Sequence, residues 1–164
     1  MSVFNSQLFE VIPDGKHKVS PVVLTEYGPV VDIEVSIPND LAEIYKKQGK
    51  PIPAPKPGLA LIDTGAKKSA IVEELIRDLG VKPIGLAFSD TTSESGVLRR
   101  LYPAHFTIPL PNKWELEFTS VVGVNVKCIS KAGDRKIIAL IGRDLLANCI
   151  FVYNGPSGAI ALAI

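Results

Sequence analysis

The chain has 164 residues, 46% of them hydrophobic and 21% charged, which excludes a disordered tail and predicts a single packed domain. Its formal net charge of +1 at pH 7 gives no reason to expect nucleic acid or an acidic membrane surface as a partner. No basic stretch leads into an apolar one at the N-terminus, and no apolar run approaches the ~20 residues that span a bilayer, so we expect a soluble, cytoplasmic protein without a membrane-spanning segment.

The composition favours strands over helices. Turn residues are frequent, with 13 Gly and 13 Pro, and the segments between them are short and rich in Val, Ile, Leu and Phe, which favours a mainly β domain. Residues 30–37 alternate apolar and polar side chains and predict a half-buried strand with its acidic side chains facing out. Asn39 and Asp40 are then in place to cap a short helix.

A proline-rich segment follows at residues 50–57. Pro at alternate positions removes backbone donors and favours extended polyproline geometry. Such a segment can be an interdomain linker or a peptide-docking motif. Because the apolar run 58–62 begins immediately after it, we prefer a long surface connection inside one domain.

The apolar run 58–62 ends at the triplet Asp-Thr-Gly of residues 63–65. A strand that stops at an acid, a hydroxyl residue and a glycine fits an active-site turn, because the strand fixes the backbone and Gly65 permits a tight or left-handed conformation. The triplet alone also fits an ordinary turn. A second apolar run, residues 137–142, strengthens the first interpretation because it too ends in Gly and is followed by Arg.

The remaining elements are predicted from their periodicity. Residues 70–79 carry apolar side chains at helical spacing, with Ser69 as the N-cap and Gly80 at the end. We expect further strands at 84–91, 97–107, 114–126, 150–153 and 159–163, and a short helix at 144–149.

The two cysteines, Cys128 and Cys149, lie in apolar surroundings. Without a secretion signal they favour buried thiols in a reducing compartment, with a disulfide as the alternative. Neither has a histidine at metal-ligand spacing, and the chain has only His17 and His105. The sequence therefore predicts no metal site and argues against zinc and against Cys/His catalysis.

Three short motifs, in their order and spacing, resemble those of the retropepsin-like aspartic proteases, which comprise retroviral proteases and their cellular and bacterial relatives. They are Ala-Leu-Ile-Asp-Thr-Gly-Ala at 60–66, Leu-Ile-Gly-Arg-Asp-Leu-Leu at 140–146 and Tyr-Asn-Gly-Pro-Ser-Gly at 153–158. The resemblance implies a mainly β fold over residues 29–164, a single-lobe closed β-barrel with one or two short helices. Residues 1–28 form an N-terminal extension of unknown role, with three interpretations open: an extra strand, an arm that wraps a partner, or a disordered leader.

The resemblance also implies a homodimeric aspartic endopeptidase that hydrolyses a protein or peptide substrate without a cofactor. In this chemistry two carboxylates share one proton and act as base and acid toward water and substrate. The chain supplies one such residue, Asp63, because Asp90, the closest second candidate, lacks the glycine. The second carboxylate would come from Asp63 of another copy across a twofold axis. Thr64 would hydrogen-bond across that axis, and Gly65 would let the substrate backbone approach.

Two further regions take expected roles from the same resemblance. Ala66 completes the active-site loop, and Ile141, Gly142 and Arg143 would support that loop from behind and contribute to the dimer. The hairpin 87–101 lies where the family carries its flap, a lid over the bound peptide, although it also fits an exposed β-turn. The expected flap residues are Thr91, Thr92, Ser93, Glu94, Ser95 and Gly96.

Lys67 departs from the family pattern. In many viral members this position is acidic and pairs with the Arg of the Gly-Arg motif, so here Arg143 needs another partner, either Asp144 or a carboxylate of the other subunit. Positive charge from Lys67 and Lys68 disfavours a shared proton, which motivates an alternative function as a catalytically weak or inactive dimerisation or peptide-binding module. A third hypothesis takes the proline-rich segment as the functional element, docking onto an aromatic-lined groove of a partner.

Overall fold

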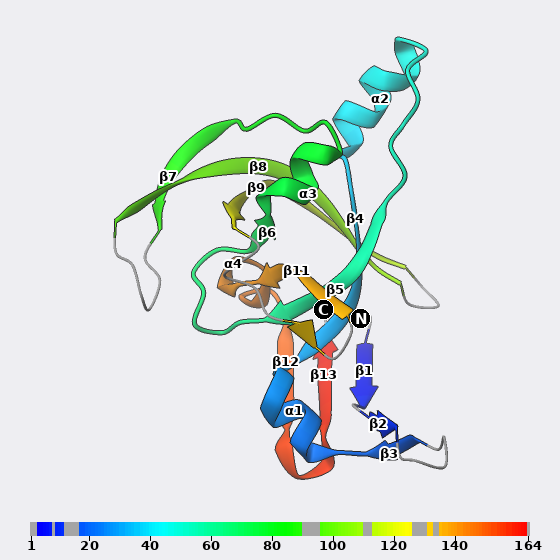
Figure 1. Ribbon diagram of the computed structural model, residues 1–164, viewed down its shortest axis with the longest axis vertical. Coiled ribbons are helices and arrows are strands. Elements are labelled where there is room, and N and C mark those ends of the chain that lie inside the picture. Colours follow the sequence, from blue (N-terminus) through cyan, green and yellow to red (C-terminus); the bar gives the residue numbers. More distant parts are fainter. Residues whose placement is uncertain are drawn as a thin grey trace.

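The computed structural model describes residues 3–7, 9–11, 17–89, 96–109, 113–125, 131–132 and 135–163. A closed ring of six strands forms the body of the molecule (Figure 1). In the order of their hydrogen-bonded neighbours, these are β11 (Arg135–Ile141), β5 (Lys56–Ile62), β4 (Val30–Ser36), β8 (Val97–Ile108), β9 (Trp114–Val124) and β6 (Ala70–Val72), and β6 pairs again with β11. The predicted mainly β class and the closed barrel are therefore confirmed.

Two short strands extend this ring. β7 (Gly85–Ser89) pairs with β8, and β10 (Lys131–Ala132) pairs with β11. Side chains that point inward from the ring form one large hydrophobic core around Tyr102 and Phe106, both fully buried. The alternation predicted for residues 30–37 is confirmed, because Val31, Ile33 and Val35 are buried while the intervening polar side chains are exposed or half-buried.

A smaller sheet lies at one end of the barrel (Figure 1). It contains β1 (Val3–Gln7), β13 (Ala159–Ala163) and β12 (Ile150–Asn154), in the order β1-β13-β12. The 3₁₀ turn η2 (Gly155–Ser157) joins β12 to β13, and β2 (Phe9–Val11) pairs with β3 (His17–Val19) beside this sheet. Within residues 1–28, Val3–Gln7 forms strand β1, which pairs antiparallel with the C-terminal strand β13.

Four short helices complete the described part of the chain: α1 (Pro21–Tyr27), α2 (Asn39–Lys47), α3 (Glu73–Asp78) and α4 (Arg143–Leu146). Leu24 of α1 is buried in the main core, whereas α2 has no fully buried residue and projects from the barrel in Figure 1. Residues 51–55 form neither helix nor strand and connect α2 to β5. No helix in the described ranges has the length and apolarity needed to cross a membrane.

The helix predicted at 70–79 is partly wrong. Residues 70–72 form β6, which runs parallel to β9 and antiparallel to β11, and helix α3 begins only at Glu73. The strand forms because hydrogen bonds to two neighbouring strands outweigh the local helical spacing of the apolar side chains. As a result Ser69 is not a helix cap, and Val72 takes that position. α4 likewise starts one residue before the predicted 144 and ends at Leu146.

Candidate active site

Asp63 stands at the point where the parallel pairing of β5 with β11 ends. Its backbone N–H donates to the carbonyl oxygen of Ile141 at 2.9 Å, so the two strands hold the acid's backbone in place. Ile141 itself is fully buried. Asp63 is half-buried, while Thr64 and Gly65, the next two residues, are exposed. Asp63 therefore lies at the rim of the core, as the strand-to-turn pattern indicates.

Backbone amides hold the Asp63 carboxylate. Its Oδ1 accepts from the N–H of Gly65 at 2.8 Å and from the N–H of Ala66 at 3.2 Å. A Cβ on Gly65 would lie 3.1 Å from this same oxygen, which would press on the held carboxylate. The tight turn therefore fixes one carboxylate oxygen by two donors that carry no net charge.

The loop of residues 63–66 has a wall behind it. The N–H of Arg143 donates to the carbonyl oxygen of Ala66 at 2.9 Å, and the Arg143 Nε–H donates to the same oxygen at 3.4 Å. Gly142 is packed so closely that a Cβ there would lie 2.6 Å from the carbonyl carbon of Lys68, a distance that real Cβ atoms do not adopt. The structure thus brings Asp63, Ala66 and residues 141–143 together, and it explains why position 142 must be glycine.

A second layer of contacts joins the loop to α4. The N–H of Ser69 donates to both oxygens of Asp144 at 3.0 and 2.9 Å, and its hydroxyl donates to Asp144 Oδ1 at 2.7 Å. The N–H of Gly142 donates to the Ser69 hydroxyl oxygen at 3.1 Å. Asp144 was one of two expected partners of Arg143, but its oxygens are occupied by Ser69. No local pattern could have predicted this, because the two residues are far apart in sequence.

The hairpin expected to form a flap is present in its described part. β7 and β8 pair antiparallel, with Phe88 opposite Leu98. Gly96 precedes β8 with a positive φ of 67°. The other expected flap residues lie outside the described residues: Thr91, Thr92, Ser93, Glu94 and Ser95. Whether this hairpin contacts a substrate stays a prediction.

The base of this hairpin is tied to α3. Arg100 Nη1 donates to Glu73 Oε1 at 2.6 Å, and the Tyr102 hydroxyl donates to the same oxygen at 2.9 Å. Burial raises the pKa of Glu73, but the hydrogen bonds from Arg100 and Tyr102, together with the charges of Arg100 and Arg77, outweigh burial and lower the pKa below 4.5. Glu73 is therefore ionised at neutral pH and links the helix that follows the Asp63 loop to the hairpin.

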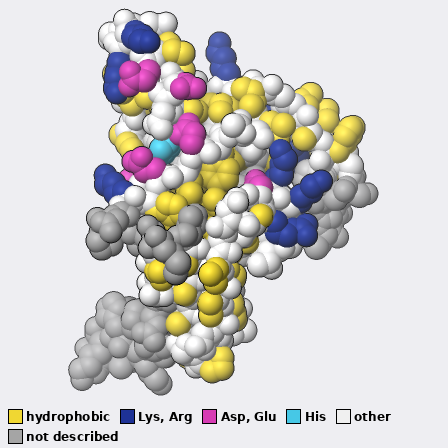
Figure 2. All heavy atoms as spheres, turned by 180° about the vertical axis from the view of Figure 1, so that it is seen from behind, with side chains coloured by type: hydrophobic (Ala, Val, Ile, Leu, Met, Phe, Trp, Pro, Cys, Tyr) yellow, Lys and Arg dark blue, Asp and Glu magenta, His cyan; other side chains and the backbone are white. Residues whose placement is uncertain are grey.

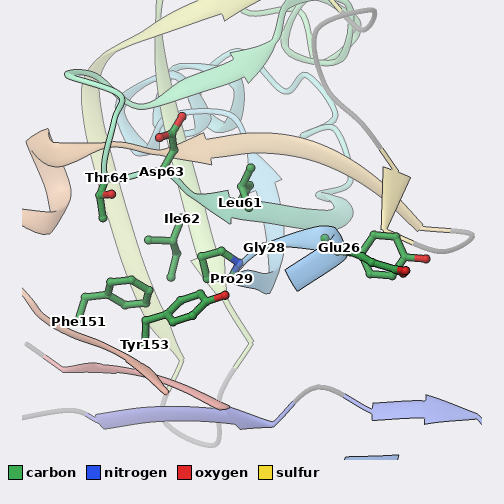
Figure 3. A pocket seen from close by; sticks show the side chains of 10 residues that line it. Glu26, Gly28, Pro29, Leu61, Ile62, Asp63, Thr64, Phe151 and Tyr153 are labelled. Carbon is green, nitrogen blue, oxygen red and sulfur yellow. The ribbon is translucent and has the colours of Figure 1, made fainter. Parts of the chain in front are cut away.

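A hollow of about 640 Å³ opens beside the Asp63 loop. Its walls include Thr64, an expected site residue, together with Leu61, Phe151 and Tyr153, which the sequence did not mark as site residues. In Figure 3 the Asp63 carboxylate points away from the two aromatic rings. Asp63 and Thr64 themselves line the hollow, so it reaches the loop that carries the carboxylate.

Cysteine and metal chemistry find little support in the described part of the chain. Burial raises the pKa of the Cys149 thiol, which keeps it protonated at neutral pH, and its Sγ–H donates to the carbonyl oxygen of Leu145 at 3.4 Å. Cys128 lies outside the described residues. Within the described ranges, no group of three or more His, Cys, Asp or Glu side chains is placed to hold a metal ion.

Comparison with known proteins gives a likeness in structure but none in sequence. No protein-family model matches the chain, and no curated protein matches it. Among solved structures, the chain is similar to a retropepsin-like aspartic protease from Rickettsia conorii, with 16% sequence identity and a TM-score of 0.41 over 98% of this chain and 92% of that chain. Both values are low, and neither activity nor assembly follows from them.

Proposed function

We propose that this protein is a homodimeric aspartic endopeptidase in which Asp63 of each of two chains activates the attacking water. The observation that carries the proposal is the Asp63 carboxylate itself. It is placed at the end of a core strand, held by the amides of Gly65 and Ala66, and backed by residues 141–143. A turn built in this way presents an acid in one fixed orientation, which is what proton transfer to a substrate requires.

The reaction needs two carboxylates and one proton between them. The ionised carboxylate takes a proton from water while the water oxygen attacks the peptide carbonyl carbon, and the protonated carboxyl gives its proton to the carbonyl oxygen. The resulting gem-diol then collapses. The C–N bond breaks as the nitrogen takes the proton from the carboxyl group and one gem-diol hydroxyl gives its proton to the ionised carboxylate. A carboxylic acid and an amine leave, and the pair of carboxylates again holds one proton. No covalent intermediate with the protein forms.

The second carboxylate comes from a second copy of the chain. Asp144, the other acid that the structure places against this loop, has both oxygens bound to Ser69. A twofold axis that passes beside Asp63 brings two identical carboxylates together, so each chain needs to supply only one acid. Like charges at such close range cannot both ionise, so the pair retains one proton.

The surface next to the loop supports this assembly. β12 is an outer strand of the smaller sheet, and its side chains Ile150, Val152 and Tyr153 are 63%, 49% and 49% exposed. An apolar edge strand is a surface on which another strand can pair. The hollow between β12 and Thr64 continues this surface up to the Asp63 loop. A second copy that covers β12 therefore also reaches the loop that carries the acid.

The test is digestion of a peptide library at several pH values by the wild-type protein and by Asp63→Asn, with the mass of both proteins measured by sedimentation. We expect cleavage by the wild type alone and a dimer mass for both. Equal cleavage by both proteins would remove Asp63 from the mechanism, and a single-chain mass for an active wild type would remove the dimer. Peptide binding without cleavage by either protein would favour the peptide-binding module that Lys67 and Lys68 motivate.

A further inference from the structure

Three cationic side chains surround the Asp63 loop. Lys67 and Lys68 follow Ala66 directly, and Arg143 is hydrogen-bonded to the Ala66 carbonyl oxygen; all three are exposed. In the part of the chain that the structure describes, none of the three forms an ion pair with a carboxylate. We call these residues the basic rim.

In the described part of the chain, neither Asp144 nor Glu73 forms an ion pair with a cation of the basic rim. Asp144 is bound to Ser69, and Glu73 is bound to Arg100 and Tyr102. In Figure 2 one group of Lys and Arg lies on the flank of the β7–β8 hairpin, whereas on the flank towards α2 Lys and Arg are mixed with most of the visible Asp and Glu. The three cations of the basic rim therefore have no carboxylate partner among the described residues and are available to an anionic side chain of a bound peptide.

Two of the three cationic groups are held in place by neutral oxygens. Lys68 Nζ donates to the Ser120 hydroxyl oxygen at 3.2 Å, and Arg143 Nε donates to the carbonyl oxygen of Ala66 at 3.4 Å. These contacts position the cations without neutralising them. A cation that is already positioned loses less side-chain entropy when an anion binds to it.

Chain geometry relates the basic rim to a bound peptide. The N–H of Ala66 contacts the Asp63 carboxylate, and Lys67 is the next residue. An extended peptide advances about 3.3 Å per residue, so its side chains two or three residues from the reacting bond lie roughly 7–10 Å from it. The flexible four-carbon stem of Lys67 suits it to reach that zone.

We propose that the basic rim selects peptides that carry Asp or Glu two or three residues from the bond that is cleaved. This inference rests on the proposed endopeptidase function and adds the class of its substrate. A carboxylate in that position forms charge-assisted hydrogen bonds with Lys67 and with its neighbours. Because the rim is solvent-exposed, we expect a preference of about fivefold in kcat/KM at low salt, which shrinks as ionic strength rises.

The experiment uses peptides that are identical except for Glu, Gln or Lys at these positions. Wild type is compared with Lys67→Glu/Lys68→Glu. A control with the same change in net charge is Lys47→Glu/Lys50→Glu, because both residues are exposed and lie on or just after the projecting helix α2. We expect wild type and control to prefer the Glu peptide, and the rim variant to lose or reverse the preference while it still cleaves the Gln peptide.

Two results would overturn the inference: equal kcat/KM for the Glu and Gln peptides in the wild type, or equal loss of the preference in rim and control variants. If no peptide is cleaved at all, the proposed function fails separately. The rim is then judged by binding of the same peptides, labelled with a fluorophore, in anisotropy titrations. Tighter binding of the Glu peptide by wild type but not by the rim variant supports the rim, and equal affinities reject it. If the double variant fails to fold, the same measurements are made on Lys67→Gln, which removes one positive charge without adding a negative one.

Discussion

At the scale of single residues, contacts from the protein backbone decide the shape of the Asp63 loop. Amides of Gly65 and Ala66 hold the carboxylate, the amide of Arg143 holds the carbonyl of Ala66, and the backbone at Lys68 lies against Gly142. Backbone contacts of this kind depend little on which side chains surround them. They depend strongly on positions where a side chain does not fit.

Gly142→Ala tests the closest of these approaches. The new Cβ would lie 2.6 Å from a backbone carbon of Lys68, so the loop or β11 must shift, and we expect a loss of about 1–3 kcal/mol in the free energy of unfolding. Gly85→Ala is the matched control, because its Cβ would meet nothing closer than 3.9 Å. Urea titrations of both variants measure the difference. A Gly142→Ala protein as stable as the wild type would contradict the tight packing.

Ser69→Ala tests the polar layer behind the loop. The change leaves the buried amide of Gly142 and one oxygen of Asp144 without their hydroxyl partner, and we expect a destabilisation of about 1–3 kcal/mol. Ser120→Ala is the comparison, since Ser120 is half-buried and, among the described residues, its hydroxyl is hydrogen-bonded only to the exposed Lys68. Thermal unfolding followed by circular dichroism distinguishes the two. Equal melting temperatures for Ser69→Ala and Ser120→Ala would show that water replaces the Ser69 hydroxyl.

At the scale of elements, β6 shows what the sequence could and could not predict. The strands at 30–37, 58–62 and 137–142 have clear alternation or long apolar runs, and the structure contains each of them. Residues 70–72 fit a helix locally, and only their pairing with β9 and β11 makes them a strand. The turn at Asp63 was predictable because its residues are consecutive. The Ser69–Asp144 contact and the aromatic wall of the hollow were not, because distant parts of the chain form them.

The link between α3 and the hairpin leads to a pH prediction. The folded pKa of Glu73 lies below its ordinary value of 4.5, so the unfolded chain binds this proton more readily than the folded chain. The stabilisation from Glu73 is therefore complete above about pH 4.5 and is lost as the pH falls through the folded pKa. We expect Glu73→Gln to be less stable than wild type at pH 7, with a smaller difference at pH 3.

Urea titrations at both pH values measure this effect. The control is Glu74→Gln, because Glu74 is the exposed neighbour of Glu73. We expect the Glu74 variant to follow the wild type at both pH values. A difference between Glu73→Gln and wild type that stays constant with pH would show that protonation of Glu73 does not control this contact.

At the scale of the whole molecule, the proposed dimer predicts that assembly depends on the apolar edge strand β12 more than on other exposed apolar side chains. Val152→Lys places a charge in the middle of β12, where Val152 is 49% exposed, and we expect a single-chain mass and a loss of cleavage that is partly restored at high protein concentration. Ile52→Lys is the control, because Ile52 is 43% exposed in the proline-rich connection. Sedimentation velocity and peptide cleavage provide the two readouts. Unchanged mass in Val152→Lys would place the interface elsewhere.

The closing strand of the barrel has a consequence for the order of events during synthesis. β11 comes late in the chain, and it supplies both the carbonyl of Ile141 that accepts from Asp63 and the connection to Arg143, whose amide holds Ala66. Until residues 135–143 have left the ribosome, β5 lacks its parallel neighbour and the acid-bearing turn has no wall behind it. If the chain is a peptidase, it is inactive during its own synthesis and does not cleave other nascent chains on the same polysome.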